Sequence, residues 1–385
     1  MKPIYFDSAA TTPVMNSVIE KMTPYFSKLF GNPSAAYSLA SFSRKAIDEA
    51  RESVANLIGA NAEEIYFTSG GSESDNWAVK GAAFSCLGGK RNKIVTTPIE
   101  HHAVLNACDF LKSLGFDIEF IPVDDKGVVK LNEAEKIIDE NTRLVSVMAA
   151  NNEVGTIEPL ADIADMAERK GAIFHTDAVQ AAGHIKIDVN KLKVHMLSLS
   201  GHKFGAPKGI GALYIKNGID IQPLIHGGGQ EKGMRGGTEN VPYIAALGEA
   251  ARYAALNMED ENAHVEAMRN RLMYGLLKEV PNSIINGSTT NRLPSNLNIS
   301  FLGINGRTLV SVLNKYGIYT SGASACSSSA KEPSHVLRSM MLCDERIRGA
   351  LRLTIGRDNT DDEIDYAIKI IPEAVEMLRK AGNNG

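Results

Sequence analysis

The feature that most constrains the fold of this chain is an alternation of short apolar segments with longer helix-like segments between residues 63 and 215. Residues 74–84, 101–114 and 160–169 have the pattern of helices. Alternating strands and helices form βαβ units, in which helices cover both faces of a mostly parallel sheet. We therefore expect an α/β fold here. The predicted strands are 64–68, 93–97, 116–121, 143–148, 172–176 and 196–199.

The pattern changes after about residue 239, where a long helical stretch runs to residue 278. The elements predicted after it are a strand at 296–301, a helix at 307–314, a strand at 351–355 and an amphipathic helix at 361–381. A chain of 385 residues is long enough for two domains. We expect a large α/β domain at 15–255, and a smaller α+β domain formed by 1–14 and 256–385.

Composition and charge exclude several classes of protein. The formal net charge is −4, and no cluster of Lys and Arg predicts contact with a phosphate backbone, so we expect no nucleic-acid partner. No apolar run is long enough to span a bilayer. Asp7 interrupts the first apolar residues too early for a signal peptide. We expect a soluble, cytoplasmic protein with no membrane partner.

The four cysteines, Cys86, Cys108, Cys326 and Cys343, form no CxxC pair. Zinc-ribbon and thioredoxin-like sites are therefore not expected. Four cysteines in a chain of this length are also too few for a disulfide framework. We expect four free thiols.

Small and polar residues follow five of the predicted strands. Ligands of open α/β sheets bind beyond the carboxyl ends of the strands, so these segments predict one site at one edge of the sheet. The segments are 69–74, 98–102, 151–155, 177–180 and 200–203.

The segment from Ser69 to Ser72 lies between a predicted strand and a predicted helix. Gly70 and Gly71 would let backbone N–H groups face a ligand, and a helix N-terminus favours an anion, so the segment is typical of a phosphate cradle. It matches neither GxxxxGK[ST] nor GxGxxG, so it gives no support for nucleotide binding. The alternative is an ordinary helix-capping turn.

Asp177 directly follows an apolar strand, where a carboxylate is costly unless it pairs with a cation or a donor. A protonated ring nitrogen of a cofactor would suit it, and a turn residue is the alternative. His101, at a strand-to-helix junction, could stack on a planar cofactor or simply cap the helix. The adjacent His102 would point elsewhere on a helix, so the pair predicts no metal site.

Lys203 comes after an apolar run that is followed by Ser200, Gly201 and His202. A lysine among apolar groups has a lowered pKa and a nucleophilic amine, which forms Schiff bases. The alternative is a surface lysine in a glycine-rich turn. A phosphate cradle, a buried carboxylate, a stacking ring and a sheltered lysine together predict a pyridoxal 5'-phosphate (PLP) site.

The segments that contain these candidate residues resemble those of the cysteine desulfurases of the NifS/IscS type in the class V aminotransferase superfamily. The resemblance covers nearly the whole chain and implies the PLP-dependent transferase fold of the aspartate aminotransferase type. The motifs that carry it are YFDSAATTP (5–13), GNPS (31–34), FTSGGSESDN (67–76), EHHAVL (100–105), NNEVG (151–155), HTDAVQ (175–180), SGHKFGAPKG (200–209), HGGGQEKGMRGGTEN (226–240), SACSSS (324–329), EPSHVLR (332–338) and LRLTIGR (351–357).

The resemblance implies a role for each cofactor-binding residue. Lys203 would bind PLP covalently and then act as a base. Asp177 would pair with the pyridinium nitrogen, and Gln180 would hydrogen-bond the ring oxygen. His101 would stack on the ring and move protons. The residues implied for the phosphate are Gly71, Ser72, Ser200, His202 and Thr238 of the partner subunit.

The resemblance also implies a substrate site and an assembly. Asn152, which also lies at the cofactor, and Arg352 would hold the substrate carboxylate, the arginine through its bidentate fork. A site that takes a threonine from a second subunit requires a homodimer. Two positions depart from the family pattern: Tyr37 stands near a common histidine, and Ser72 stands at a common threonine.

Cys326 lies in a run of small residues, 321–330, that predicts a mobile surface loop. Taken alone it could be an idle thiol. The resemblance implies that its thiolate takes sulfur from L-cysteine, releases L-alanine and keeps a persulfide for acceptors such as iron–sulfur scaffolds or tRNA-thiolation proteins. The alternatives are a selenocysteine lyase, another class V PLP enzyme, or a non-catalytic subunit of a sulfur-assembly system.

Overall fold

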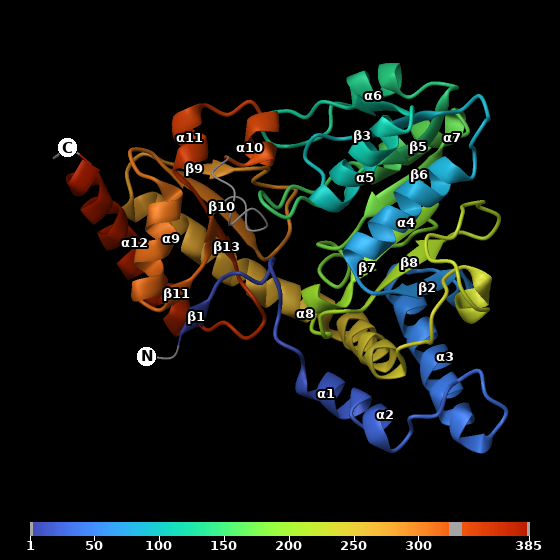
Figure 1. Ribbon diagram of the computed structural model, residues 1–385. Helices are drawn as coiled ribbons and strands as arrows, with labels where there is room; N and C mark the ends of the chain where they lie inside the picture. Colours follow the sequence, from blue (N-terminus) through green and yellow to red (C-terminus); the bar gives the residue numbers. More distant parts are fainter. Residues whose placement is uncertain (1–2, 323–332, 383–385) are drawn as a thin grey trace.

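The computed structural model describes residues 3–322 and 333–382 (Figure 1). Its largest sheet has seven strands in the order β2-β8-β7-β6-β5-β3-β4. The neighbours from β7 to β4 pair in parallel, whereas β8 runs antiparallel to both β2 and β7. The strands are β2 (Ile65–Thr68), β3 (Lys93–Thr96), β4 (Asp117–Phe120), β5 (Thr142–Ser146), β6 (Ile173–Asp177), β7 (Met196–Ser200) and β8 (Gly211–Ile215). The predicted mostly parallel α/β sheet is confirmed.

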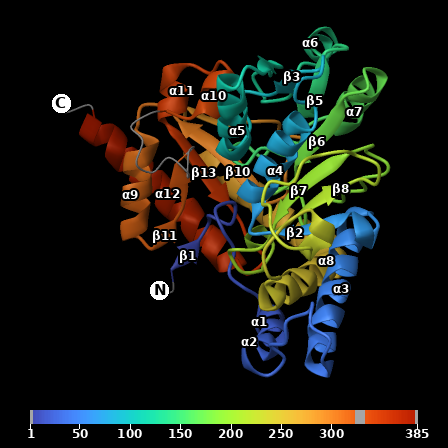
Figure 2. The same ribbon diagram turned by 45° about the vertical axis from the view of Figure 1, so that its right-hand side comes forward.

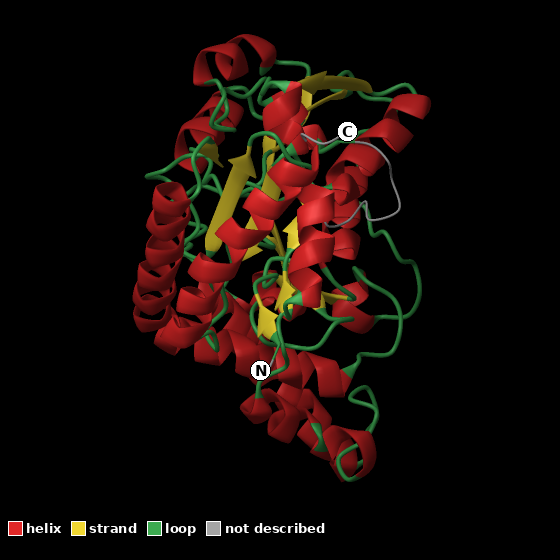
Figure 3. Ribbon diagram, turned by 90° about the vertical axis from the view of Figure 1, so that its left-hand side faces the viewer, coloured by secondary structure: helices red, strands yellow, loops and turns green. Residues whose placement is uncertain are grey.

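Helices cover both faces of this sheet, as Figure 3 shows. Alternate residues of a strand point to opposite faces. Leu144 of β5 belongs to a buried apolar cluster with residues of α4 and α5, whereas its neighbour Val145 belongs to another cluster with residues of α3, α7 and α8. Both side chains are fully buried. The helices around the sheet are α1 (Asn16–Met22), α2 (Pro24–Ser27), α3 (Ser38–Ile58), α4 (Gly71–Phe84), α5 (His102–Ser113), α6 (Leu131–Ile137), α7 (Leu160–Arg169) and α8 (Val241–Glu279), with short 3₁₀ turns at Ala62–Glu64, Gly201–Lys203 and Gln230–Gly233.

A second, antiparallel sheet has the order β12-β13-β10-β9. A separate parallel pair joins β1 to β11 near the N-terminus. The strands are β1 (Ile4–Tyr5), β9 (Ser283–Asn286), β10 (Asn296–Phe301), β11 (Ile318–Tyr319), β12 (Ser321–Gly322) and β13 (Ala350–Thr354), and the helices are α9 (Gly306–Lys315), α10 (His335–Ser339), α11 (Asp344–Arg348) and α12 (Asp361–Gly382).

The N-terminal residues pack with this second sheet. Ile4 and Phe6 share a buried apolar cluster with Leu297 of β10 and Ile371 of α12. The long helix α8 runs from α3 to the second sheet, so it connects the two halves (Figures 1 and 2). This packing supports the division that we propose for the chain, with 15–255 in one domain and 1–14 and 256–385 in the other.

Within 3–322 and 333–382, the structure contains no helix that is both long and apolar enough to cross a bilayer.

The contact between α3 and α8 generates a stability prediction. A Cβ atom at Gly248 would lie 2.5 Å from both Cα and Cβ of Ala50. Because the first of these is a backbone atom, the helices must move apart, and Gly248→Ala should lower the free energy of unfolding by about 2 kcal/mol despite the better helix propensity of alanine. Urea unfolding followed by circular dichroism measures this.

The matched control is Gly229→Ala, because a Cβ atom there would meet nothing within 4 Å. Its stability should stay within about 0.5 kcal/mol of the parent protein. Equal stability of the two variants would contradict the tight α3–α8 packing.

Candidate active site

One cavity of about 270 Å³ lies at the carboxyl ends of the large sheet's strands. It collects every site residue predicted from the sequence except Thr238 and Cys326. The predicted residues that line it are Gly71, Ser72, His101, Asn152, Asp177, Gln180, Ser200, His202, Lys203 and Arg352.

The N-terminus of α4 forms one end of the cavity. Gly70 has a φ of 150°, a conformation that side chains disfavour. A Cβ atom at Gly71 would come within 2.7 Å of Val179 Cγ2, so only glycine fits without a shift. The first-turn N–H groups and the Ser72 hydroxyl are therefore available to an anion, which the helix dipole favours.

His202 borders the same end of the cavity. Its Nδ1 atom lies 3.1 Å from Thr11 Oγ1. Burial, with smaller effects from Lys203 and Lys208, lowers the pKa of His202 to about 4. The imidazole is therefore neutral near pH 7 and can supply one N–H to a phosphate group.

Asp177 is the last residue of β6 and is only 4% exposed. Its Oδ1 atom accepts the Val179 N–H at 2.8 Å. Burial raises the pKa of Asp177, and the charges of His101 and Lys203 oppose this effect. A further cation in the cavity, such as a protonated ring nitrogen, would favour the carboxylate form.

Lys203 ends the short 3₁₀ turn that follows β7. Its Nζ atom donates to the backbone oxygens of Ala9 at 2.6 Å and Ala10 at 3.0 Å. Gln180 Nε2 donates to the same Ala9 oxygen at 3.0 Å. The N-terminal segment thus holds the lysine amine inside the cavity.

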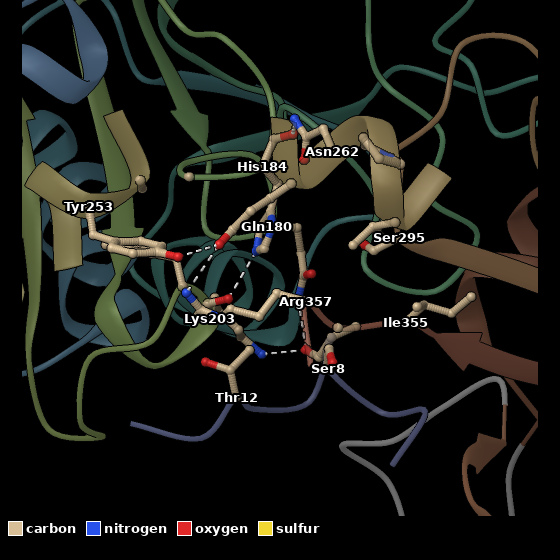
Figure 4. A pocket seen from close by; sticks show the side chains of 18 residues that line it. Ser8, Thr12, Gln180, His184, Lys203, Tyr253, Asn262, Ser295, Ile355 and Arg357 are labelled. Carbon is tan, nitrogen blue, oxygen red and sulfur yellow. Dashed lines mark hydrogen bonds and ion pairs between the residues drawn. The ribbon is translucent and has the colours of Figure 1, made fainter. Parts of the chain in front are cut away.

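A smaller cavity of about 50 Å³ lies on the other side of Lys203, and Gln180 lines both cavities. Figure 4 shows Lys203 between Gln180, Thr12 and Tyr253 in this second cavity. His184 Nε2 lies 2.9 Å from the Lys203 backbone oxygen. The lysine is therefore fixed at both its main chain and its side-chain end.

His101 is the N-cap of α5, and its Nδ1 atom accepts the Ala103 N–H at 3.1 Å. In the neutral ring this bond places the proton on Nε2. The cap therefore fixes both the position of the ring and its tautomer.

Arg352 reaches the cavity from β13 of the second sheet and is 1% exposed. Its Nη2 atom pairs with Asp7 Oδ1 at 2.7 Å, and its Nη1 donates to the Asn152 backbone oxygen at 2.9 Å. Among the described residues, its buried Nε atom has no hydrogen-bond partner. The guanidinium is thus held in place and keeps a donor for an anionic ligand.

Comparison with known proteins identifies the family. The family model described as aminotransferase class-V matches residues 4–367. The chain belongs to the class V aminotransferase family. The cysteine desulfurase IscS of Methanosarcina thermophila is 49% identical over 98% of this chain and 93% of its own length. The cysteine desulfurase IscS of Clostridium botulinum is 47% identical over 98% of this chain and 96% of its own length.

Solved structures agree with this assignment. A NifS-like protein superposes with a TM-score of 0.92 and 41% identity, over 98% of this chain and all of the other. The structure of SspA in complex with cysteine gives a TM-score of 0.81 and 38% identity, over 93% of this chain and all of the other. The expected resemblance and fold are confirmed.

Class V aminotransferases of this kind are PLP-dependent, so this protein uses PLP. The cavity fits that cofactor. A helix N-terminus beside Ser72 suits the phosphate, the buried Asp177 suits the ring nitrogen, and Lys203 supplies the amine. When bound, PLP supplies an electron sink for chemistry at Cα of an amino acid.

Two residues predicted for this class V site are not among those that line the cavity in the described part of the chain. Thr238 is exposed. Its neighbours Gly237 and Glu239 instead line a separate cavity of about 200 Å³. Cys326 lies outside the described residues.

The remaining cysteines differ in their surroundings. Cys108 is buried, which raises the pKa of its thiol to about 12. Burial also raises the pKa of Cys86, whereas Cys343 is exposed.

The sequence analysis missed several residues that line the cavity. Asp75 lies four positions after Gly71 on α4, on the same helix face, and that spacing could have found it. Ala9 and Ala10 belong to the quoted motif at 5–13, but they act through backbone oxygens, which leave no signal in the residue types.

The buried Asp177 generates a prediction about cofactor affinity. Asp177→Asn removes the negative charge that would face the ring nitrogen, and the apparent Kd for PLP should rise at least ~10-fold, which corresponds to about 1.4 kcal/mol. Titration of the apoprotein with PLP, followed by visible absorbance, measures it. The control is Asp362→Asn, an exposed position in the first turn of α12. An unchanged Kd in folded Asp177→Asn would contradict the pairing.

Proposed function

We propose that this protein is a PLP-dependent cysteine desulfurase that converts L-cysteine to L-alanine and carries the sulfur as a persulfide on Cys326. The names of relatives that are 47–49% identical along nearly the whole chain support the activity. The structural observation that carries it is Arg352, a buried guanidinium that lines the same cavity as Lys203 and whose Nε atom has no hydrogen-bond partner among the residues that the structure describes. This arrangement suits the carboxylate and amine of an α-amino acid.

Arg352 would bind the substrate carboxylate through its planar fork. Asp7 and the Asn152 backbone oxygen orient the guanidinium before substrate arrives, so little entropy is lost on binding. The substrate amine would then lie on the Lys203 side of the cavity.

Two groups would move protons in this reaction. The Lys203 amine, steered by the Ala9 and Ala10 oxygens, would take the proton from Cα of the substrate. His101, whose cap bond leaves the proton on Nε2, would exchange a proton with the bound amino acid.

Sulfur transfer would use Cys326. Its thiolate attacks the substrate sulfur, and the new S–S bond forms as the Cβ–S bond breaks. The carbon skeleton takes up a proton at Cβ, regains the proton removed from Cα, and leaves as L-alanine. The persulfide remains on Cys326. Ser321 supports this assignment, because it pairs with Arg352 in the β12–β13 ladder and lies five residues before Cys326 in the sequence.

The active unit would be a homodimer in which Thr238 of the partner subunit completes the phosphate site. The exposure of Thr238 outside the cavity of its own chain supports this arrangement. The acceptor of the persulfide sulfur would be a protein such as an iron–sulfur scaffold or a tRNA-thiolation protein, in the cytoplasm.

Product analysis with L-cysteine, PLP and a thiol reductant tests the reaction. The parent protein should release alanine and sulfide, and Cys326→Ala should lose at least ~100-fold in rate because no other thiol acts as nucleophile. The control is Cys343→Ala, which removes an exposed thiol and should keep the parent rate. Equal alanine release by Cys326→Ala would favour the lyase mechanism of the selenocysteine lyase alternative, and a keto acid product would favour another class V reaction.

The role of Arg352 generates a second prediction. Arg352→Lys keeps the positive charge beside Asp7 but loses the bidentate fork, so KM for L-cysteine should rise at least ~10-fold. Arg348→Lys, at an exposed position of α11, is the matched control and should keep the parent KM. If both variants keep it, the carboxylate binds elsewhere in the cavity.

A further inference from the structure

The cavity contains a second buried carboxyl group that the proposed reaction does not use. Asp75 lies on α4, is 1% exposed, and lines the same cavity as Asp177. Two buried carboxylates that share a site cannot both carry a negative charge at low cost. The surroundings of each group decide which one is charged.

Among the residues described in the structure, no charged cation forms an ion pair with Asp75. His175 Nε2 lies 3.8 Å from Asp75 Oδ1. Hydroxyl groups already contact both ring nitrogens of His175, with Ser146 Oγ at 2.8 Å and Ser198 Oγ at 3.0 Å. Burial also lowers the pKa of His175 to about 3, so the ring is neutral. The contact is therefore no ion pair.

The other groups that face Asp75 also disfavour its charge. The pKa of Asp75 is raised well above its usual range. Burial is the largest cause, and the negative charges of Asp177 and Glu100 act in the same direction. The Ser198 hydroxyl hydrogen-bonds to the carboxyl group and opposes this only in part. Within the described part of the chain, the buried Oδ1 atom has no hydrogen-bond partner.

The positive charge that the cavity can hold acts on Asp177 instead. A proton gained by His101, or the charge of Lys203, favours the charged form of Asp177, which also accepts the Val179 N–H. Of the two carboxyl groups, Asp177 therefore has the surroundings that stabilise a charge.

We propose that Asp75 is a neutral carboxylic acid in the folded protein and acts as a positioning residue for Asp177. A neutral Asp75 leaves Asp177 as the single negative charge of this carboxyl pair, so that the ring nitrogen of the cofactor meets one defined anion. The link to the cofactor rests on the PLP site of the proposed function, whereas the protonation state of Asp75 does not.

Infrared difference spectroscopy of the apoprotein tests the protonation state directly. The spectrum of the parent protein minus that of Asp75→Asn at pH 7.5 should contain the C=O stretching band of a protonated carboxyl group. Absence of this band, with the variant folded by circular dichroism, would overturn the proposal. If Asp75→Asn does not fold, Asp75→Ser gives the same comparison.

Glu158→Gln is the matched control for this measurement. Glu158 is 4% exposed, its Oε2 atom accepts the Val129 N–H at 2.9 Å, and it does not line the cavity. Burial raises the pKa of Glu158 to about 8, so its own protonated band should be visible at pH 7.5 and should disappear in the variant. The control shows that one buried carboxyl group can be detected in this protein.

The pH dependence of stability gives an independent readout. A neutral Asp75 in the folded state must ionise on unfolding above about pH 4, so the parent protein loses stability relative to Asp75→Asn as pH rises. The ratio of the two unfolding constants should grow by up to ~10-fold per pH unit between pH 5 and 7. A ratio that stays constant, or that falls as pH rises, would show that Asp75 is charged in the folded protein.

The positioning role is tested in the holoenzyme. If Asp75 carries no charge, Asp75→Asn should leave the pH at which the visible band of bound PLP changes within ~0.3 unit of the parent value. A shift of about one unit or more would show that Asp75 is charged beside the cofactor and would overturn its role. None of these measurements uses L-cysteine, so failure of the desulfurase assay and failure of this proposal are distinguishable.

Discussion

The N-terminal segment that contains Asp7 and Ala9 contacts residues of both sheets at the cavity, and the geometry of the site depends on these contacts. Asp7 pairs with Arg352 on the second sheet, and the Ala9 N–H donates to Thr354 Oγ1 at 2.9 Å. On the other side, the Ala9 backbone oxygen accepts from Lys203, which follows a strand of the large sheet. A few residues therefore fix the distance between the group that would bind the substrate carboxylate and the amine that would bind the cofactor.

Burial sets the chemistry of the cavity more than any single contact does. It keeps His202 neutral, raises the pKa of Asp177, and makes a second charge on the neighbouring carboxyl group costly. In such surroundings a cationic ring nitrogen would be stabilised by Asp177, and an anionic group would be stabilised by the N-terminus of α4. The cavity thus stabilises a negative charge at one end and a positive charge at the other. This distribution suits a cofactor with an anionic phosphate and a cationic ring nitrogen.

The sequence predicted those parts of the structure that local pattern controls. Asp177 was found because a charged residue directly after an apolar strand is unusual, and Lys203 because it follows an apolar strand after a short run of small and polar residues. Strand β8 (Gly211–Ile215) was not among the predicted strands, and its apolar pattern would be the same for either strand direction. The contact of Lys203 with Ala9 could not be predicted either, since it joins backbone and side-chain atoms 194 residues apart.

Arg352 illustrates why the second half of the chain belongs to the site. A guanidinium that is 1% exposed is costly without an anion, and Asp7 supplies one at 2.7 Å. The pair is neutral as a whole, so an incoming carboxylate adds a net negative charge to the cavity. The protonated amine of the same amino acid carries the cation that balances it, and it would lie on the Lys203 side of the cavity. Binding of an amino acid would therefore engage both sheets at once, through a guanidinium from one and an amine from the other.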